Sequence, residues 1–419
     1  MIDKTIPNRR LIATAICSFG LTFQDIPAYA ENAKDDNNFA TSTGSASFSR
    51  YIRQFRSIAV NSGVSASLYD NVTKGMTADP RVLRLLGNQP EFNSQIWNYL
   101  EKRVSAQRIS TGRAKKKQHA KSLAAIQQRY GVDRHILLSI WGMESNFGSF
   151  KGNMSVIRSL ATMGFEGRRK RFGRSQMLAA FKILQNGDIN PKQFTGSWAG
   201  AMGHTQFIPT TYNAHAVDWT GDGKRDIWNS VEDALASTAN YLRKAGWRAN
   251  RPWGWEVKLP AKFDYSTAGK SGSRTVNKWV QLGVKPASFK NFGGFNEITR
   301  LIIPAGSKGP AFLITDNYKA ILAYNKSHSY ALAVGHLADR IAGRGRFKTA
   351  WPVKDKPFNR AQRQELQKLL TKRGFNTGGT DGRIGGKTLA AIAAYQKSIG
   401  LIGDGYANHG LLTRLRSNN

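Results

Sequence analysis

A single carboxylate lies at the end of an apolar run in residues 139–150, SIWGMESNFGSF. Glu144 is the only Asp, Glu, Lys or Arg between Arg134 and Lys151, in a chain with 62 Lys and Arg but 27 Asp and Glu. Burial raises the pKa of a carboxylate, because its charged form loses water. A carboxylic acid that stays protonated near neutral pH can protonate a leaving glycosidic oxygen. On spacing alone, an acid that binds a neighbouring helix for structural reasons fits equally well.

A helix that begins after Asp133 would place Glu144 on its apolar face. Ile136, Ile140 and Glu144 follow one another at intervals of four residues, and residues at that spacing share one face of a helix. Asp133 is a suitable N-cap, and Gly148 can end the helix. We therefore expect the side chain of Glu144 to point inward.

Small residues dominate a second stretch, GSWAGAMGHTQFIPTTY at residues 196–212. Its Gly and Ala residues let the backbone approach another group closely, and His204, Thr205 and Gln206 add neutral polar groups. Pro209 opposes a regular helix beyond it. The segment suits a groove wall that donates hydrogen bonds to sugar amides. Close helix packing through small residues is the alternative.

A third group of polar side chains, Tyr324, Asn325 and Tyr330, lies around an expected helix start. Tyr offers an apolar face with a hydroxyl, which suits sugar recognition. Ser327 or Ser329 is the expected cap of that helix.

Residues 218–233, DWTGDGKRDIWNSVED, resemble a calcium loop. Asp218, Thr220, Asp222 and Asp226 occupy its positions 1, 3, 5 and 9, and a Gly occupies position 6. Oxygen ligands at alternate positions favour Ca²⁺, so we predict a structural calcium ion held by these four residues. A metal-free loop rich in Asx turns is the alternative.

The end of this loop departs from the calcium pattern. Position 12 is Asn229, where a Glu is usual. Glu232 or Asp233 could close a longer loop, and the sequence does not decide between them.

The first thirty residues predict export. They combine a basic start, the apolar run LIATAICSFGLTF and the small-residue sequence AYA before Glu31, which is the pattern of a cleaved signal peptide. The run is too short to span a membrane. Cys17, the chain's one cysteine, lies in the run, and Ile16 before it is unlike a lipoprotein signal. We therefore expect a periplasmic protein without disulfides, and a disordered leader over residues 31–47.

A net charge of +35 predicts an anionic partner or envelope surface. Export counts against a genome-binding role, and the sequence has no base-stacking or groove-reading motif, so no nucleic acid is expected as a partner.

The pattern of apolar residues predicts a mainly α fold with a small β subdomain. Helical spacing recurs from residue 48 to residue 130 and again beyond Glu144. WEVKLP, TRLIIP and AFLIT, between residues 252 and 315, indicate short strands. Residues 346–357 are predicted to form a linker, and residues 358–419 are predicted to form a separate helical unit.

The motifs ESNFG, GAMGHTQFIP, the DxTGDG loop and AYNKSHSYA occur in this order over residues 48–345. As an ordered set they closely resemble the membrane-bound lytic transglycosylase B family, which acts on bacterial peptidoglycan. The resemblance implies a catalytic domain with a lysozyme-like helical core, an inserted calcium loop and a small β subdomain.

The resemblance also implies functional residues. Glu144 matches the family's catalytic acid and base, which works without a cofactor. The positions that match substrate-binding residues are Ser145, Arg168, Arg169, Ser197, Gln206, Tyr241, Tyr324, Asn325 and Tyr330.

The C-terminal unit resembles a second family. Within residues 358–413, LQKLLTKRGF, the helix TLAAIAAYQKSIGL and two DG pairs are similar to the three-helix peptidoglycan-binding domain. A generic small helical domain is the alternative.

The resemblance to lytic transglycosylases implies cleavage of the β-1,4 bond between N-acetylmuramic acid (MurNAc) and N-acetylglucosamine (GlcNAc), with release of 1,6-anhydromuramoyl ends. Because no second carboxylate is identified, assistance from the substrate's N-acetyl group is expected. A water-using muramidase would need a second carboxylate, for which Glu166 is one candidate. A non-catalytic wall-binding protein is another alternative. A third alternative, an exported protein that binds nucleic acid, is supported by the positive charge alone.

Overall fold

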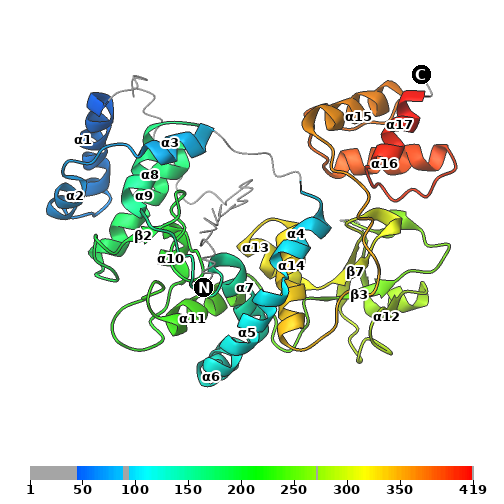
Figure 1. Cartoon of the computed structure of the whole chain (residues 1–419), viewed down its shortest axis with the longest axis horizontal. Coiled ribbons are helices and arrows are strands. Elements are labelled where there is room, and N and C mark those ends of the chain that lie inside the picture. The colour runs from blue at the N-terminus through cyan, green and yellow to red at the C-terminus, as the bar shows by residue number, and fades with distance from the viewer. Residues whose placement is uncertain (1–44, 88–93, 270–271, 418–419) are drawn as a thin grey trace, which may run out of the picture.

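The computed structural model describes residues 45–87, 94–269 and 272–417 (Figure 1). The expected signal peptide and nearly all of the expected leader lie outside these residues. Within them the chain is mainly helical and has one small sheet of five strands, as the sequence predicts. In the part of the chain that is described, no helix is both long enough and apolar enough to cross a membrane.

One group of helices packs around an aromatic core. Phe48 and Phe55 of the first helix are buried in it together with Tyr69 and Phe181, and the hydroxyl of Tyr69 donates a hydrogen bond to the carbonyl of Ile52 at 2.7 Å. The helices are α1 (Ser45–Asn61), α2 (Ala66–Thr73), α3 (Pro80–Gly87), α8 (Val156–Phe165), α9 (Lys170–Gln185) and α10 (Pro209–His215).

A second group of helices surrounds α7, the helix that carries Glu144. Asp133 caps α7 by accepting the backbone N–H of His135 at 2.7 Å, as predicted. Ser139 of α7 donates to the carbonyl of Val334 at 2.7 Å and fixes α14 against it. The helices are α4 (Ile96–Arg103), α5 (Ala106–Gln118), α6 (Ala120–Tyr130), α7 (Arg134–Ser145), α11 (Val231–Lys244), α13 (Asp316–Tyr324) and α14 (His328–Ile341).

Two helix boundaries differ from the prediction. Helix α7 ends at Ser145 rather than near Gly148, because Asn146 takes a left-handed backbone with φ 50° and stops it; Asn adopts this conformation more easily than most residues. Pro209 begins helix α10 instead of opposing it. At the first position of a helix the missing N–H of proline costs nothing.

The predicted strands form an antiparallel sheet in the order β4-β6-β7-β3-β5. Leu313 pairs with Trp255 on one side and with Leu301 on the other, and the sheet packs on Trp279 of the short helix α12 (Val276–Gln281). The strands are β3 (Gly254–Lys258), β4 (Ser273–Thr275), β5 (Lys285–Pro286), β6 (Ile298–Ile302) and β7 (Ala311–Ile314), and a separate pair joins β1 (Met154–Ser155) to β2 (Thr195–Gly196).

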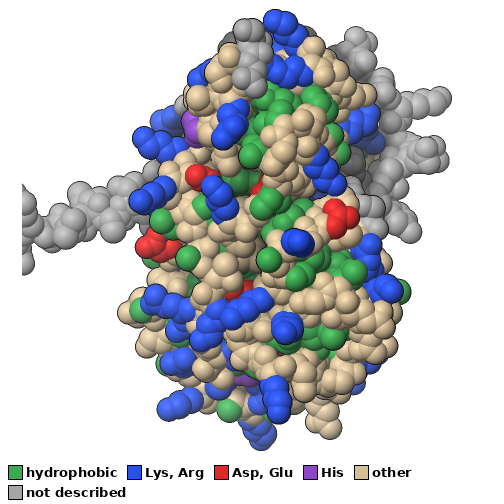
Figure 2. All heavy atoms as spheres, turned by 90° about the vertical axis from the view of Figure 1, so that its right-hand side faces the viewer, with side chains coloured by type: hydrophobic (Ala, Val, Ile, Leu, Met, Phe, Trp, Pro, Cys, Tyr) green, Lys and Arg blue, Asp and Glu red, His purple; other side chains and the backbone are tan. Residues whose placement is uncertain are grey.

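The last three helices, α15 (Arg360–Lys372), α16 (Gly386–Ser398) and α17 (His409–Ser417), form a unit with its own apolar core. This unit touches the β subdomain through Asp404, which accepts hydrogen bonds from the backbone N–H and the hydroxyl of Ser307 at 2.8 and 2.7 Å. Figure 2 shows the face that this unit and the sheet present, where Lys and Arg are frequent and acids are few.

Candidate active site

Glu144 lies in the last turn of α7 and meets a residue from α14. The hydroxyl of Tyr330 donates a hydrogen bond to Oε1 of Glu144 at 2.6 Å, and Tyr330 itself is buried. Glu144 keeps part of its surface exposed, so a ligand can reach the carboxyl group. The inward direction predicted from spacing is therefore correct.

The surroundings of Glu144 favour the protonated acid. Burial raises the pKa of Glu144 to about 7, although the Tyr330 hydroxyl and the positive charge of Arg103 act in the opposite direction. Among the described residues, no other carboxylate contributes to this pKa shift. Close to neutral pH the group can thus both donate and accept a proton.

A set of hydrogen bonds fixes the end of α7 next to Glu144. The hydroxyl of Ser145 donates to the carbonyl of His204 at 2.6 Å and accepts the N–H of Gly148 at 2.9 Å. The indole N–H of Trp141 donates to Nδ1 of His204 at 3.0 Å. Burial and nearby Lys151 lower the pKa of His204 to about 4, so this ring is neutral. Ser145, which is buried, holds the backbone rather than facing an open groove.

Gln206 lies in the tight turn that follows His204. Its backbone is left-handed, with φ 55°, and its Nε2 donates to the carbonyls of Lys151 and Gly203 at 3.1 and 2.8 Å. No donor in the described part of the chain reaches its Oε1. Ser197, on the same small-residue segment, accepts the N–H of Ala201 through its hydroxyl at 3.0 Å. Both side chains shape the backbone of this segment.

Tyr324 and Tyr241 form an aromatic wall, with ring centroids 5.1 Å apart. The hydroxyl of Tyr324 donates to the carbonyl of Thr205, and that of Tyr241 donates to the carbonyl of Ala323 at 2.7 Å. Next to Tyr324, Oδ1 of Asn325 is buried and has no hydrogen-bond partner within the described residues. It is a free acceptor beside the wall.

Tyr99 and Arg103 on α4 also lie near Glu144 and were not predicted from the sequence. The charge of Arg103 lowers the pKa of Glu144, and that of Glu144 in turn raises the pKa of Tyr99, so both residues lie near the carboxyl group. The guanidinium of Arg103 lies over the ring of Tyr99, 5.6 Å from its centroid. Their spacing of four residues on one helix face was the available signal.

Arg168, Arg169 and Glu166 lie at the junction of α8 and α9, and none of them forms a hydrogen bond with Glu144. Arg168 is exposed, and the guanidinium of Arg169 lies over the ring of Phe172 at 4.4 Å. The structure thus brings Tyr330 directly to Glu144 but leaves the arginine pair at a separate element.

Asp218, Asp222 and Asp233 form a cluster whose carboxylate oxygens lie within 4.8 Å of one another. Asp233 is buried and accepts the backbone N–H groups of Trp219 and Thr220 at 3.0 and 3.2 Å. Thr220 also donates its hydroxyl to Asp218 at 3.3 Å. Hard oxygen atoms at this spacing fit a Ca²⁺ ion, and Asp233 rather than Glu232 lies in the cluster.

The expected ligand Asp226 does not belong to this cluster. Its two oxygens accept the backbone and side-chain N–H groups of Asn229 at 2.9 and 3.0 Å, because it caps the turn that follows. Glu232 also points elsewhere, toward Nδ1 of His119 at 3.1 Å and the hydroxyl of Ser122 at 3.3 Å.

Residues 47–339 match the transglycosylase SLT domain family, and residues 359–415 match a peptidoglycan binding domain family. The chain belongs to the transglycosylase SLT domain family. It is a lytic transglycosylase that acts on peptidoglycan and carries a C-terminal peptidoglycan-binding domain.

Comparison with individual relatives supports membership of this family. This transglycosylase is 29% identical over 274 residues to membrane-bound lytic murein transglycosylase B of Escherichia coli, covering 62% of this chain and 74% of the relative. It is 49% identical to SltB3 of Pseudomonas aeruginosa in complex with NAG-anhNAM-pentapeptide, with a TM-score of 0.85 over 88% of this chain and 99% of SltB3. The Escherichia coli transglycosylase Slt35 in complex with calcium matches 70% of this chain and 92% of its own, with a TM-score of 0.60 and 25% identity.

Proposed function

We propose that this transglycosylase cleaves the MurNAc–GlcNAc bond without water and that Glu144 is its single acid and base. The observation that carries the proposal is the carboxyl group of Glu144, whose pKa burial raises to about 7. A water-using glycosidase would place a second carboxylate across the bond. In the described chain no other carboxylate contributes to the pKa of Glu144, which supports a mechanism with one carboxyl group.

The reaction needs only one carboxyl group, which acts first as an acid and then as a base. Protonated Glu144 gives its proton to the oxygen between MurNAc and GlcNAc, and the C1–O bond of MurNAc breaks. The oxygen of the substrate's own N-acetyl group stabilises the positive charge that develops at C1. Ionised Glu144 then removes the proton of the MurNAc 6-hydroxyl, whose oxygen forms a bond to C1. The products are a GlcNAc end and a 1,6-anhydromuramoyl end.

Tyr330 and the residues of the aromatic wall have separate roles in this proposal. The Tyr330 hydroxyl orients the carboxyl group of Glu144 and stabilises its ionised form. Oε1 of Gln206 accepts a hydrogen bond from an amide or hydroxyl group of the sugar. Tyr324 and Tyr241 supply the apolar faces on which sugars stack.

Mass spectrometry of the muropeptides released from purified peptidoglycan tests the mechanism. Wild type should release anhydromuramoyl ends, and Glu144→Gln should release none while still binding the polymer. Reducing ends from the wild type would refute the water-free mechanism. Anhydromuramoyl ends from Glu144→Gln at the wild-type rate would refute the role of Glu144.

The carboxylate cluster in the loop of residues 218–233 supports a bound structural Ca²⁺ ion. Asp218, Asp222 and Asp233 would bind the ion, with the Thr220 oxygen close by. The calcium complex of Slt35 favours this assignment. The ion would stabilise the loop and takes no part in the chemistry.

The sequence also supports a location in the periplasm and an attraction to anionic surfaces there. The apolar run and the AYA sequence within residues 1–30 favour a cleaved signal peptide and a periplasmic enzyme. The peptidoglycan-binding domain would hold the enzyme on its polymer, and the net charge of +35 would add attraction to anionic envelope surfaces.

A further inference from the structure

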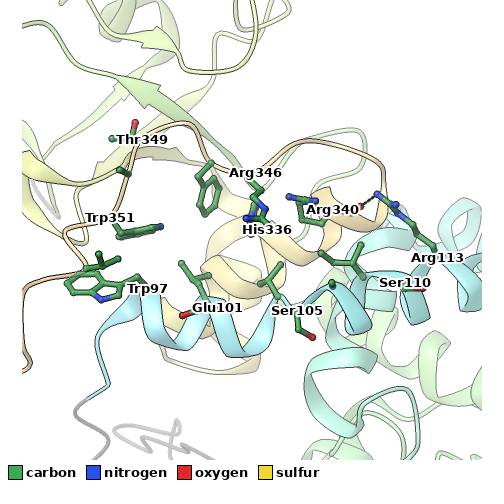
Figure 3. A pocket seen from close by; sticks show the side chains of 17 residues that line it. Trp97, Glu101, Ser105, Ser110, Arg113, His336, Arg340, Arg346, Thr349 and Trp351 are labelled. Carbon is green, nitrogen blue, oxygen red and sulfur yellow. Dashed lines mark hydrogen bonds between the residues drawn. The ribbon is translucent and has the colours of Figure 1, made fainter.

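A second groove lies between α4, α5, α14 and the segment that follows α14 (Figure 3). Its volume is about 800 Å³, within the range of sites for small molecules and short peptides. None of the residues around Glu144 lines it. It therefore differs from the catalytic site, although α4 contributes side chains to both.

Three arginines from three elements gather at one end of this groove. Arg113 comes from α5, Arg340 from α14 and Arg346 from the segment after α14 (Figure 3). Arg113 donates to the backbone carbonyl of Arg340 at 2.9 Å, and no described acid forms an ion pair with any of the three. Nearby Arg344 does have such a pair, with Asp339 at 3.0 Å.

The positive charges at this end lie close enough to affect one another. Burial, Arg346 and Arg113 all lower the pKa of Arg340. Burial, Arg340 and Arg346 lower the pKa of His336 to about 4, and its ring stacks on Phe347 with ring centroids 3.9 Å apart. His336 is therefore neutral at pH 7, and the positive potential comes from the guanidinium groups. Such an end favours carboxylate groups, which guanidinium binds with charge-assisted hydrogen bonds.

The other part of the groove is aromatic and carries one acid. Trp97 of α4 and Trp351 line it, with ring centroids 6.1 Å apart. Glu101, one turn after Trp97, also lines the groove, is exposed and has no ion-pair partner in the described chain. The groove thus has a cationic end, an apolar floor and an isolated carboxylate that can receive an amine.

The wall formed by residues 346–353 is fixed in place. The backbone N–H groups of Lys348 and Thr349 each donate to one carboxylate oxygen of Glu256, both at 2.7 Å. Trp351 and Phe347 also pack against the main helical core. This part of the expected linker is therefore held as one side of a preformed groove.

We propose that this groove binds a free peptide stem of peptidoglycan, next to the catalytic site. An uncross-linked stem, L-Ala-γ-D-Glu-diaminopimelate-D-Ala, carries three carboxylates, one amine and small methyl groups, which match the three arginines, Glu101 and the apolar floor. The inference rests on the proposed function in that its ligand is part of the same polymer. Glu101, on the wall near the apolar floor, disfavours an anionic lipid, because it would repel the headgroup and be desolvated by the acyl chain.

Calorimetric titration of the full chain with the tetrapeptide acetylated on its L-Ala nitrogen, which leaves the diaminopimelate amine as its one amine, tests this site. We expect binding by the wild type, and an affinity at least about tenfold lower for the double variant Arg340→Gln/Arg346→Gln. The matched control is Arg50→Gln/Arg53→Gln, which removes two exposed charges from α1 and should bind as the wild type does. Glu101→Gln should weaken binding of this peptide but not of the form in which the diaminopimelate amine is acetylated as well. Melting curves check that each variant is folded.

Three outcomes would overturn the inference. They are no tetrapeptide binding by a wild type that still releases anhydromuramoyl ends, equal binding by the arginine double variant, and capture of phosphatidylglycerol vesicles through Arg340 and Arg346 without peptide binding. Binding that depends on these arginines in a protein that releases no anhydromuramoyl ends would support the groove and refute the catalytic proposal. Stem binding in the groove and the catalytic proposal can therefore be refuted independently of each other.

Discussion

The hydroxyl of Tyr330 and the carboxyl group of Glu144, 186 residues apart in sequence, share a hydrogen bond of 2.6 Å. This bond stabilises the ionised carboxylate and lowers the pKa of Glu144, against the effect of burial. The carboxyl group of Glu144, which acts as the acid when protonated, can therefore also act as the base once it is ionised.

Tyr330→Phe should therefore raise the pKa of Glu144 and slow the reaction. Because Glu144 must start protonated, the alkaline limb of the pH–rate profile should move to higher pH. The rate should fall about tenfold, since a hydrogen bond to a charged group contributes roughly 1.5–3 kcal/mol. Rates of anhydromuropeptide release between pH 5 and 9 measure both effects. Tyr69→Phe, which loses a hydroxyl bonded to a backbone carbonyl, is the control and should leave the limb in place.

Glu144 should reduce the stability of the folded protein at neutral and alkaline pH. Its pKa is about 7 in the folded chain against 4.5 for an unperturbed Glu, so between these values the folded state binds more protons than the unfolded state. Stability then falls as pH rises from 4.5 to 7 and stays level above that. The full effect would be about 3 kcal/mol, and partial exposure of Glu144 reduces it to roughly 1–2 kcal/mol.

Glu144→Gln should accordingly be more stable than the wild type at pH 8 and equally stable at pH 4. Urea unfolding of both proteins at the two pH values measures the difference, in which the titration of all other groups cancels. A variant that is less stable than the wild type at pH 8 would mean that the ionised carboxylate is a net stabilising group.

Gly148→Ala tests the contact between the end of α7 and His204. Gly148 has φ +87°, and a Cβ atom there would lie 2.4 Å from Cε1 of His204. Strained backbone and overlap together should cost roughly 2–4 kcal/mol and should reduce activity by displacing Glu144. Gly246→Ala is the control, because Gly246 has φ +96° with open space around it, so only the backbone cost of about 1 kcal/mol applies. Equal melting temperatures for the two variants would contradict the proposed contact.

Local patterns in the sequence predicted the elements well. The N-cap Asp133 and the apolar spacing after it gave both the start of α7 and the direction of Glu144, because capping and periodicity act within a few residues. The runs that became β3, β6 and β7 were recognised for the same reason. The end of α7 was missed because Asn146 adopts a conformation for which Gly is the more usual residue.

Contacts between distant segments could not be derived in this way. The pairing of Tyr330 with Glu144 depends on how α14 packs on α7, and the closeness of Arg103 depends on α4. Family resemblance supplied Tyr330 as a substrate-binding residue, but not its bond to the acid. In the expected calcium loop, the spacing pattern placed Asp226 among the ligands, whereas in the structure Asp226 caps a turn and Asp233 lies in the cluster with Asp218 and Asp222.

The choice of Asp233 over Glu232 gives a prediction about calcium. Adding Ca²⁺ should raise the melting temperature of the wild type, and a chelator should lower it, because a ligand that binds only the folded state stabilises it. Asp233→Asn should lose this response, since it removes a charge from the carboxylate cluster. Glu232→Gln is the matched control, because Glu232 faces His119 and Ser122 instead, and should keep the full response. A calcium response that survives in Asp233→Asn but disappears in Glu232→Gln would reverse the assignment, because the ion would then depend on the carboxylate that the folded loop directs away from Asp218 and Asp222.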